Sequence, residues 1–205
     1  MKIMLDCSPR KIKEYSDRYG YDFWQLRTPL TGYGHYGGDW GLDNGCFTEF
    51  REAKWLSMIK EARGVDVKPK FVVMPDVVGS ARRTLELFDM FRDVAIGLSL
   101  GLVLQDGIGS FAIPWDIVDA VFVGGSDEFK VSNEAKSACR TAKILGKWVH
   151  VGRVNTLARV KDWIDLCDSI DGSGISRYDH MLENVLNAIN GKEDTMFDKP
   201  INKEK

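Results

Sequence analysis

The sequence contains no long apolar stretch, no cysteine pattern and almost no net charge. None of its apolar runs reaches the roughly 20 residues that cross a bilayer, and its first residues lack a signal-peptide pattern, so we expect a cytoplasmic protein. The four cysteines lack the CxxC or Cys/His spacing of a zinc site, which indicates reduced thiols and predicts neither a metal nor a cofactor. A net charge of −2 argues against a protein that coats nucleic acid non-specifically, because such binding depends on neutralising phosphates.

The length of 205 residues and an apolar content of 44% suit one domain with a substantial core. We expect this domain over residues 1–191 and a polar, flexible tail over residues 192–205. The composition indicates the class of protein and leaves its function open.

Eight short, nearly continuous apolar segments have the pattern of strands that are covered on both faces. They are residues 2–7, 23–27, 41–44, 71–74, 101–105, 120–124, 147–151 and 169–172. Amphipathic stretches lie between them, and the later ones predict helices over 127–145, 156–167 and 176–190. This alternation predicts an α/β protein with a compact (β/α)8 barrel of the TIM type, and an open doubly wound sheet is the alternative.

Several of these apolar segments end in a carboxylate or an amide beside glycine. Asp43, Asp76 and Asp171 each follow such a segment, as do Gln105 and the pair Gly124–Gly125. In a (β/α)8 barrel the carboxyl ends of the strands form the active site. One aspartate alone would more often cap a helix, but three at one barrel mouth predict a shared pocket. Two carboxylates that face one pocket suit glycosidic chemistry.

Motifs in these segments follow the order and approximate spacing of the queuine tRNA-ribosyltransferases, the tRNA-guanine transglycosylase family. Residues 42–47 (LDNGCF) resemble that family's Asp-Ser-Gly-Gly-Phe motif, and residues 101–107 (GLVLQDG) resemble its Gly-Ile-Val-Gln-Gly-Gly element. Residues 122–128 (FVGGSDE) are similar to its Gly-Gly-containing base-recognition loop. Residues 151–154 and 168–177 resemble the segment that carries its nucleophilic aspartate.

The resemblance implies that guanine in a nucleic acid is exchanged for a free 7-deazaguanine base, such as preQ0, through a covalent glycosyl-aspartate intermediate. It implies that Asp171 is the nucleophile and that Asp43 handles the proton of the leaving and entering bases. Asp76 would accept hydrogen bonds from the guanine N1–H and amino group. Gln105 and the Gly124–Gly125 backbone would donate to the base O6.

The chain departs from the tRNA enzymes in ways that affect the expected substrate. It is far shorter, and it ends without the zinc site that follows their catalytic aspartate. Asn44 replaces a serine of the motif and Cys46 replaces a glycine. A compact barrel without a zinc subdomain looks more like the bacteriophage and other viral DNA-guanine transglycosylases, so we expect DNA as the partner and the host cytoplasm as the location. The same exchange on tRNA and a non-catalytic barrel that binds a deazapurine are the alternatives.

Either polymer must expose its target base, because a buried carboxylate cannot reach the anomeric carbon of a stacked nucleotide. The loops after the last two strands are the usual phosphate site of barrel enzymes. Arg153 and Arg177 lie in these loops, and Lys130 follows Gly125 by a few residues. We expect all three to contact phosphate, with a solvated surface charge as the alternative for Arg153 and Lys130.

Three other residues have two interpretations each. His150 stands among bulky apolar neighbours and is interpreted as a hydrogen-bonded core residue rather than a ligand. Trp40 and Phe47 flank Asp43, and they either stack on the base or pack in the core. The glycine-rich segment 28–40 is too long for a tight turn and is expected to be a substrate loop or lid.

Overall fold

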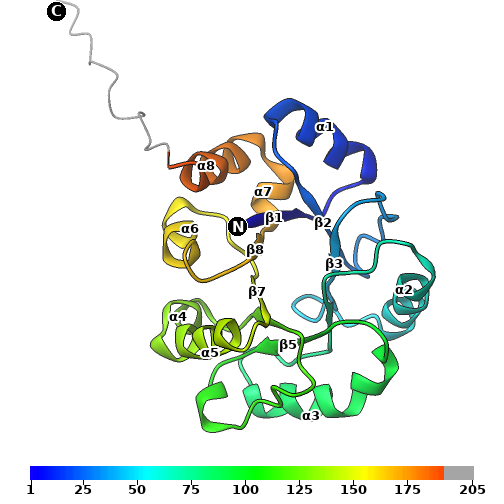
Figure 1. Cartoon of the computed structure of the whole chain (residues 1–205), viewed down its shortest axis with the longest axis vertical. Coiled ribbons are helices and arrows are strands. Elements are labelled where there is room, and N and C mark those ends of the chain that lie inside the picture. The colour runs from blue at the N-terminus through cyan, green and yellow to red at the C-terminus, as the bar shows by residue number, and fades with distance from the viewer. Residues whose placement is uncertain (192–205) are drawn as a thin grey trace, which may run out of the picture.

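A closed sheet of eight parallel strands forms the centre of the molecule (Figure 1). The computed structural model describes residues 1–191, so the predicted tail 192–205 lies outside the described residues. The strands pair in sequence order, and the last returns to pair with the first, which excludes the open doubly wound sheet. They are β1 (Lys2–Leu5), β2 (Trp24–Arg27), β3 (Trp40–Leu42), β4 (Val72–Val73), β5 (Leu100–Leu104), β6 (Ala120–Val123), β7 (Trp148–Val151) and β8 (Ser169–Asp171).

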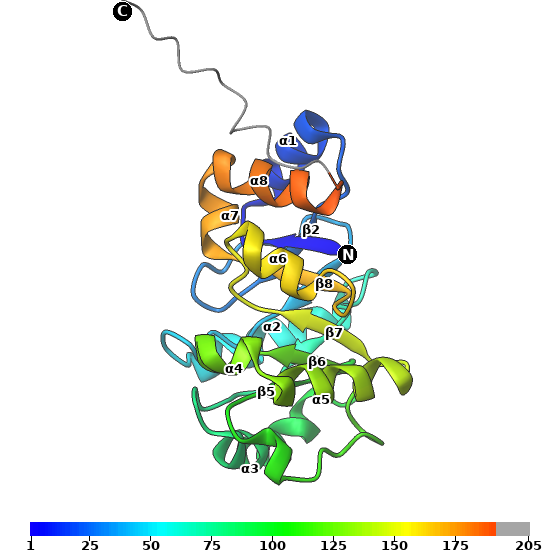
Figure 2. The ribbon, with the colours of Figure 1, turned by 90° about the vertical axis from the view of Figure 1, so that its left-hand side faces the viewer.

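Helices surround this barrel on the outside, as Figure 2 shows for the helices beside β6 and β7. Those in residues 1–191 are α1 (Pro9–Tyr19), α2 (Glu52–Gly64), α3 (Ala81–Phe91), α4 (Asp127–Val131), α5 (Asn133–Ile144), α6 (Leu157–Trp163), α7 (Ser173–Arg177) and α8 (Asp179–Ile189). Serine and threonine hydroxyls cap the first turns of most of them, as Ser8 does for α1. None of these helices combines the length and the apolar character that a membrane span needs.

Strands and helices do not alternate fully along the chain. No helix joins β2 to β3, and the connection from β5 to β6 contains only the 3₁₀ turn Ile108–Ser110. The predicted helix 127–145 is two helices, because Ser132 is extended and its hydroxyl accepts from Ala135 N to start α5. The predicted helix 176–190 is also divided, between α7 and α8, at the extended residue Tyr178, where no side chain caps the start of α8.

Large apolar side chains fill the inside of the barrel. At the amino end Trp24 and Trp148 stack, with ring centroids 5.6 Å apart and an interplanar angle of 12°. Phe71 lies above them in the same buried cluster. Gly41 leaves the space that Phe71 occupies, because a Cβ at this position would lie 2.7 Å from its ring. The barrel is therefore packed with side chains below its carboxyl end.

Arg27, the last residue of β2, is a buried cation that joins three parts of the molecule. Its Nη1 and Nη2 donate to the two carboxylate oxygens of Glu61 on α2, each at 3.0 Å, and its Nε donates to Tyr33 O at 2.8 Å. The guanidinium also lies over the Trp40 ring, 5.1 Å from its centroid. Since Arg27 is only 3% exposed, these partners offset the cost of burying its charge. They hold the helix-free connection between β2 and β3 against the barrel.

We predict that Arg27→Met lowers the free energy of unfolding by about 1–3 kcal/mol, because the Glu61 carboxylate and the Tyr33 carbonyl lose their donors. Urea unfolding measures this change. The control is Arg18→Met, since Arg18 pairs with Glu14 and Asp179 at an exposed position and its loss is expected to matter little. Equal effects of the two substitutions would contradict the proposed role of the buried pair.

Candidate active site

The carboxyl ends of the strands surround a cavity of about 320 Å³. Asp43 follows β3, Asp76 follows β4 and Asp171 ends β8, so residues far apart in the sequence meet at this end of the barrel. All the residues predicted for the site line the cavity. They are Asp43, Asp76, Gln105, Gly124, Gly125, Lys130, Arg153, Asp171 and Arg177.

Asp171 has one carboxylate oxygen held by the protein and one left over. Its Oδ1 lies 3.0 Å from His150 Nε2 and accepts from Arg153 N at 3.3 Å. Gly152 permits this approach, because a Cβ there would lie 2.6 Å from the Phe122 ring and 3.3 Å from Oδ1. Within residues 1–191 no donor contacts the other oxygen, Oδ2. The carboxylate is fixed in orientation and keeps one oxygen unengaged.

Asp76 is held from both sides by amide groups. Asn44 Nδ2 donates to its Oδ1 at 2.7 Å, and Gln105 Nε2 donates to its Oδ2 at 2.6 Å. Gln105 is itself oriented by Gly79 N, which donates to its Oε1 at 2.9 Å. Burial raises the pKa of Asp76, and these amide donors partly oppose that rise. A carboxylate has further lone pairs, so Asp76 can still accept hydrogen bonds from a group that enters the cavity.

Asp43 has a pKa far above that of an ordinary aspartate. Burial and the nearby carboxylates of Asp171 and Asp76 raise its pKa to about 7. Each of these causes disfavours the ionised form, and the backbone donors of Asn44 and Gly45 offset them only in part. A carboxyl group that titrates near neutral pH can both release and accept a proton at that pH.

The glycine pair after β6 has two different roles. Gly124 N donates to Leu104 O at 3.1 Å, so the prediction that this N–H is free for a ligand is wrong. Gly125 N has no acceptor among the described residues, and it remains the available backbone donor of the pair. Gly125 has a φ of +73°, and a Cβ there would lie 2.5 Å from the Phe129 ring. A larger residue at this position would be strained and would collide with α4.

The three basic residues of the cavity occupy different depths. Arg177 is exposed at the mouth, whereas Arg153 is half-buried, donates from Nη2 to Gly125 O at 2.8 Å and stacks 4.0 Å from the Phe47 ring centroid. Lys130 is buried at 1% exposure, and its Nζ donates to Gly152 O. Burial, with the Arg153 charge as a smaller cause, lowers the pKa of Lys130 to about 8. Lys130 is therefore not a solvated surface charge.

The two aromatic residues that flank Asp43 separate in the structure. Phe47 is 60% exposed and lines the mouth of the cavity. Trp40 is fully buried outside the cavity, and its Nε1 donates to Val67 O at 2.8 Å. Of the two, only Phe47 can meet a bound base. The predicted substrate loop contributes Thr28 and Leu30 to the cavity wall.

Three residues of the site were not predicted from the sequence or were predicted in another role. Asp6 follows the apolar run of β1 and lines the cavity, so the pattern that identified the other aspartates would have found it. Asn44 was treated only as a departure from the family motif, although it orients Asp76. His150 was interpreted as a core residue, which is correct for its burial, but the sequence carries no signal of its contact with Asp171.

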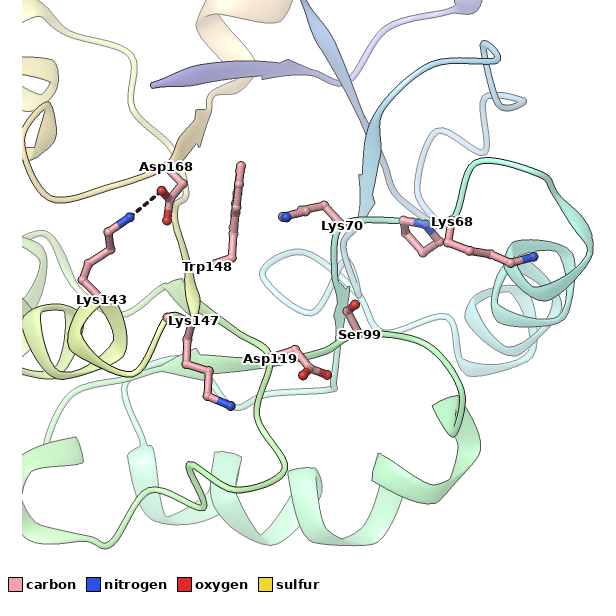
Figure 3. Close-up of a pocket in the computed structure, with 10 residues that line it drawn as sticks. Lys68, Lys70, Ser99, Asp119, Lys143, Lys147, Trp148 and Asp168 are labelled. Atoms are coloured by element: carbon pink, nitrogen blue, oxygen red, sulfur yellow. Dashed lines mark hydrogen bonds and ion pairs between the residues drawn. The ribbon is translucent and has the colours of Figure 1, made fainter.

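A second hollow, of about 420 Å³, lies at the opposite end of the barrel (Figure 3). Its aspartates hold the starts of strands. Asp119 Oδ2 accepts from Leu100 N, and Asp168 Oδ2 accepts from Val149 N, both at 2.8 Å, while Asp168 Oδ1 pairs with Lys143. Among residues 1–191, no group of three or more His, Cys, Asp or Glu side chains could hold a metal ion. Since the aspartates of this hollow are engaged by backbone N–H groups, the candidate site is the cavity at the carboxyl end.

We predict that Asp43→Asn stabilises the protein at pH 8 by about 1–4 kcal/mol and has little effect at pH 4. The pKa of an unfolded aspartate is about 3.9, and in the folded state that of Asp43 is about 7. The protonated form is thus favoured by folding, and its contribution is present below pH 4 and lost as the pH rises through 7. Thermal unfolding between pH 4 and 8 measures the difference.

The matched control is Asp165→Asn, an exposed position outside the cavity, which should keep the pH dependence of the wild type. A wild-type pH dependence in Asp43→Asn would contradict the raised pKa.

No protein-family model matches the chain, and no curated protein sequence matches it. The functional conclusion therefore depends on the barrel, the cavity and the contacts of its side chains.

Proposed function

We propose that this protein exchanges guanine in DNA for a 7-deazaguanine base through a covalent glycosyl-aspartate intermediate. The observation that supports this proposal most is the placement of Asp171, Asp43 and Asp76 around one cavity of about 320 Å³, each in a different environment. Asp171 has an oxygen that no donor among residues 1–191 contacts, Asp43 has a pKa of about 7, and Asp76 is held by two amides. These environments suit a nucleophile, a proton carrier and a hydrogen-bond acceptor respectively.

The proposed reaction has two displacements at the anomeric carbon. In the first, Asp171 Oδ2 forms a bond to this carbon while the bond to the guanine nitrogen breaks, and Asp43 gives its proton to the leaving base. In the second, Asp43 takes the proton of the incoming deazaguanine as that base attacks the carbon and releases Asp171. Two inversions retain the configuration of the sugar.

The proposed base recognition uses the acceptors and donors of the cavity wall. Asp76 accepts from the guanine N1–H and amino group, since its carboxylate keeps lone pairs beyond the two that Asn44 and Gln105 occupy. Gly125 N and the second amide hydrogen of Gln105 are the available donors for O6. A donor at O6 stabilises the negative charge that grows on the base as it departs.

The cavity requires a base that has left its stack. Its volume can hold a base with its sugar and cannot hold a duplex, so the target nucleotide is flipped out or is already single-stranded. Phe47 is exposed at the mouth, where an aromatic ring can stack on a base. Arg177 and Arg153 at the same mouth are placed to contact phosphates on either side of that nucleotide.

We predict that Asp171→Ala lowers the rate of guanine exchange by about 10⁴-fold or more, as expected for loss of a nucleophile. The measurement is incorporation of labelled guanine or labelled preQ0 into guanine-containing DNA, with tRNA in a parallel reaction. A protein–polymer adduct that survives a denaturing gel should form with the wild type and be absent in Asp171→Ala. Asp165→Ala, at an exposed position away from the cavity, is the matched control and should react like the wild type.

Each outcome separates the alternatives. Label in tRNA and none in DNA would show that tRNA is the substrate, and the proposed base exchange would stand. Tight binding of free base without an adduct or exchange on either polymer would favour a non-catalytic barrel and reject the transglycosylase. Full exchange in Asp171→Ala would remove Asp171 as the nucleophile.

A further inference from the structure

His150 lies inside the barrel, directly beneath the nucleophile proposed above. It is fully buried, and its ring packs against those of Phe71 and Phe122, with centroid distances of 5.1 and 4.6 Å. A residue with no exposed surface cannot touch a substrate. Its contact with Asp171 must therefore act through that carboxylate.

A chain of hydrogen bonds runs through His150 from one end of the barrel toward the other. Trp148 Nε1 donates to Ser169 Oγ at 2.8 Å, Ser169 Oγ lies 2.8 Å from His150 Nδ1, and His150 Nε2 lies 3.0 Å from Asp171 Oδ1. The four residues alternate between the neighbouring strands β7 and β8, which place His150 opposite Ser169 in register. The chain begins at the indole of Trp148, which Figure 3 shows in the hollow at the amino end.

The donors and acceptors fix the direction of this chain. An indole nitrogen can only donate, so Ser169 Oγ accepts from Trp148 and its own hydrogen is free to point to His150 Nδ1. His150 Nδ1 is then the acceptor, and the ring proton is on Nε2, where it donates to Asp171 Oδ1. A doubly protonated ring would instead leave the Ser169 hydroxyl hydrogen without an acceptor among the described residues, which is costly in a buried site.

This arrangement selects one oxygen of the nucleophile. Both donors to Asp171, His150 Nε2 and Arg153 N, contact Oδ1, so Oδ2 is the oxygen left to react. Because the strands fix His150 and the two aromatic rings pack against it, the carboxylate is oriented before a substrate enters.

We propose that His150 is a positioning residue. As the neutral Nε2–H tautomer, oriented by Ser169 and Trp148, it holds Asp171 Oδ1 and directs Oδ2 to the anomeric carbon. The proposal rests on the function proposed above, in which Asp171 is the nucleophile. A residue buried inside the barrel thus takes part in a reaction at the mouth of the cavity.

The first test compares His150→Phe with His150→Gln in single-turnover adduct formation. Phenylalanine keeps the ring packing and removes the donor, and adduct formation should slow about 10–100-fold, the factor expected for loss of one hydrogen bond to a charged group. Glutamine places an amide N–H near the position of the imidazole Nε2, so His150→Gln should recover most of the rate. Affinity for free guanine should be unchanged in both, because His150 is outside the surface that a base can reach.

Two results of this test would overturn the proposal. A wild-type rate in His150→Phe would show that the donor is not needed. Equal slowing in both variants, with weaker binding of free guanine, would show that His150 only supports the packing of the barrel.

The second test does not depend on activity. The chain has three histidines, and the double variant His35→Gln/His180→Gln leaves His150 as the only one for nitrogen-15 NMR. The proposal expects the neutral Nε2–H tautomer and an Hε2 resonance that moves in Asp171→Ala. The Nδ1–H tautomer, a cationic ring or an unmoved resonance would overturn it. If the wild type forms no adduct on any polymer, the proposed function fails, and this spectrum still decides whether His150 holds Asp171.

Discussion

The pairing of β8 with β1 is the constraint on which the whole site depends. It sets Met4 opposite Asp171 in register and brings the end of the described chain back to its beginning. Because all the strands are parallel, their carboxyl ends face one side, and residues from five or more connections meet there. An open sheet with the same strand order would place β1 and β8 on opposite edges. Asp6 and Asp171 would then lie far apart.

Several carboxylates around one small cavity would repel one another if all were ionised. The structure avoids this by giving each a different environment. Asp43 has a pKa of about 7, which lessens the negative charge near neutral pH, whereas Asp76 accepts from two amides. Asp171 Oδ1 accepts from Arg153 N and lies 3.0 Å from His150 Nε2. Lys130 and Arg153 supply positive charge from the wall. The pocket can thus hold several carboxyl groups close together near neutral pH.

The sequence predicts the barrel and the cavity lining better than the connections. Short apolar segments that end in a polar residue identify the strands and Asp43, Asp76 and Asp171 together, because strand direction fixes where such residues go. The apolar pattern alone does not locate the breaks at Ser132 and Tyr178, where one extended residue ends a helix and the next helix begins. Whether a single N–H, such as that of Gly124, is already hydrogen-bonded depends on pairing between strands, which the sequence does not show. The contact between His150 and Asp171 also depends on the register of β7 against β8.

The stacked pair Trp24–Trp148 and the buried cluster around it fill the inside of the barrel at its amino end, so a ligand enters the cavity from the carboxyl end. For base exchange this has a kinetic consequence. The outgoing and incoming bases use the same entrance and the same recognition groups, so the first base must leave before the second can bind. In the proposed reaction the sugar is attached to Asp171 during this interval, and the polymer remains tethered to the protein. Such an order produces parallel lines in a double-reciprocal plot, and an excess of free guanine competes with the deazaguanine for the glycosylated protein.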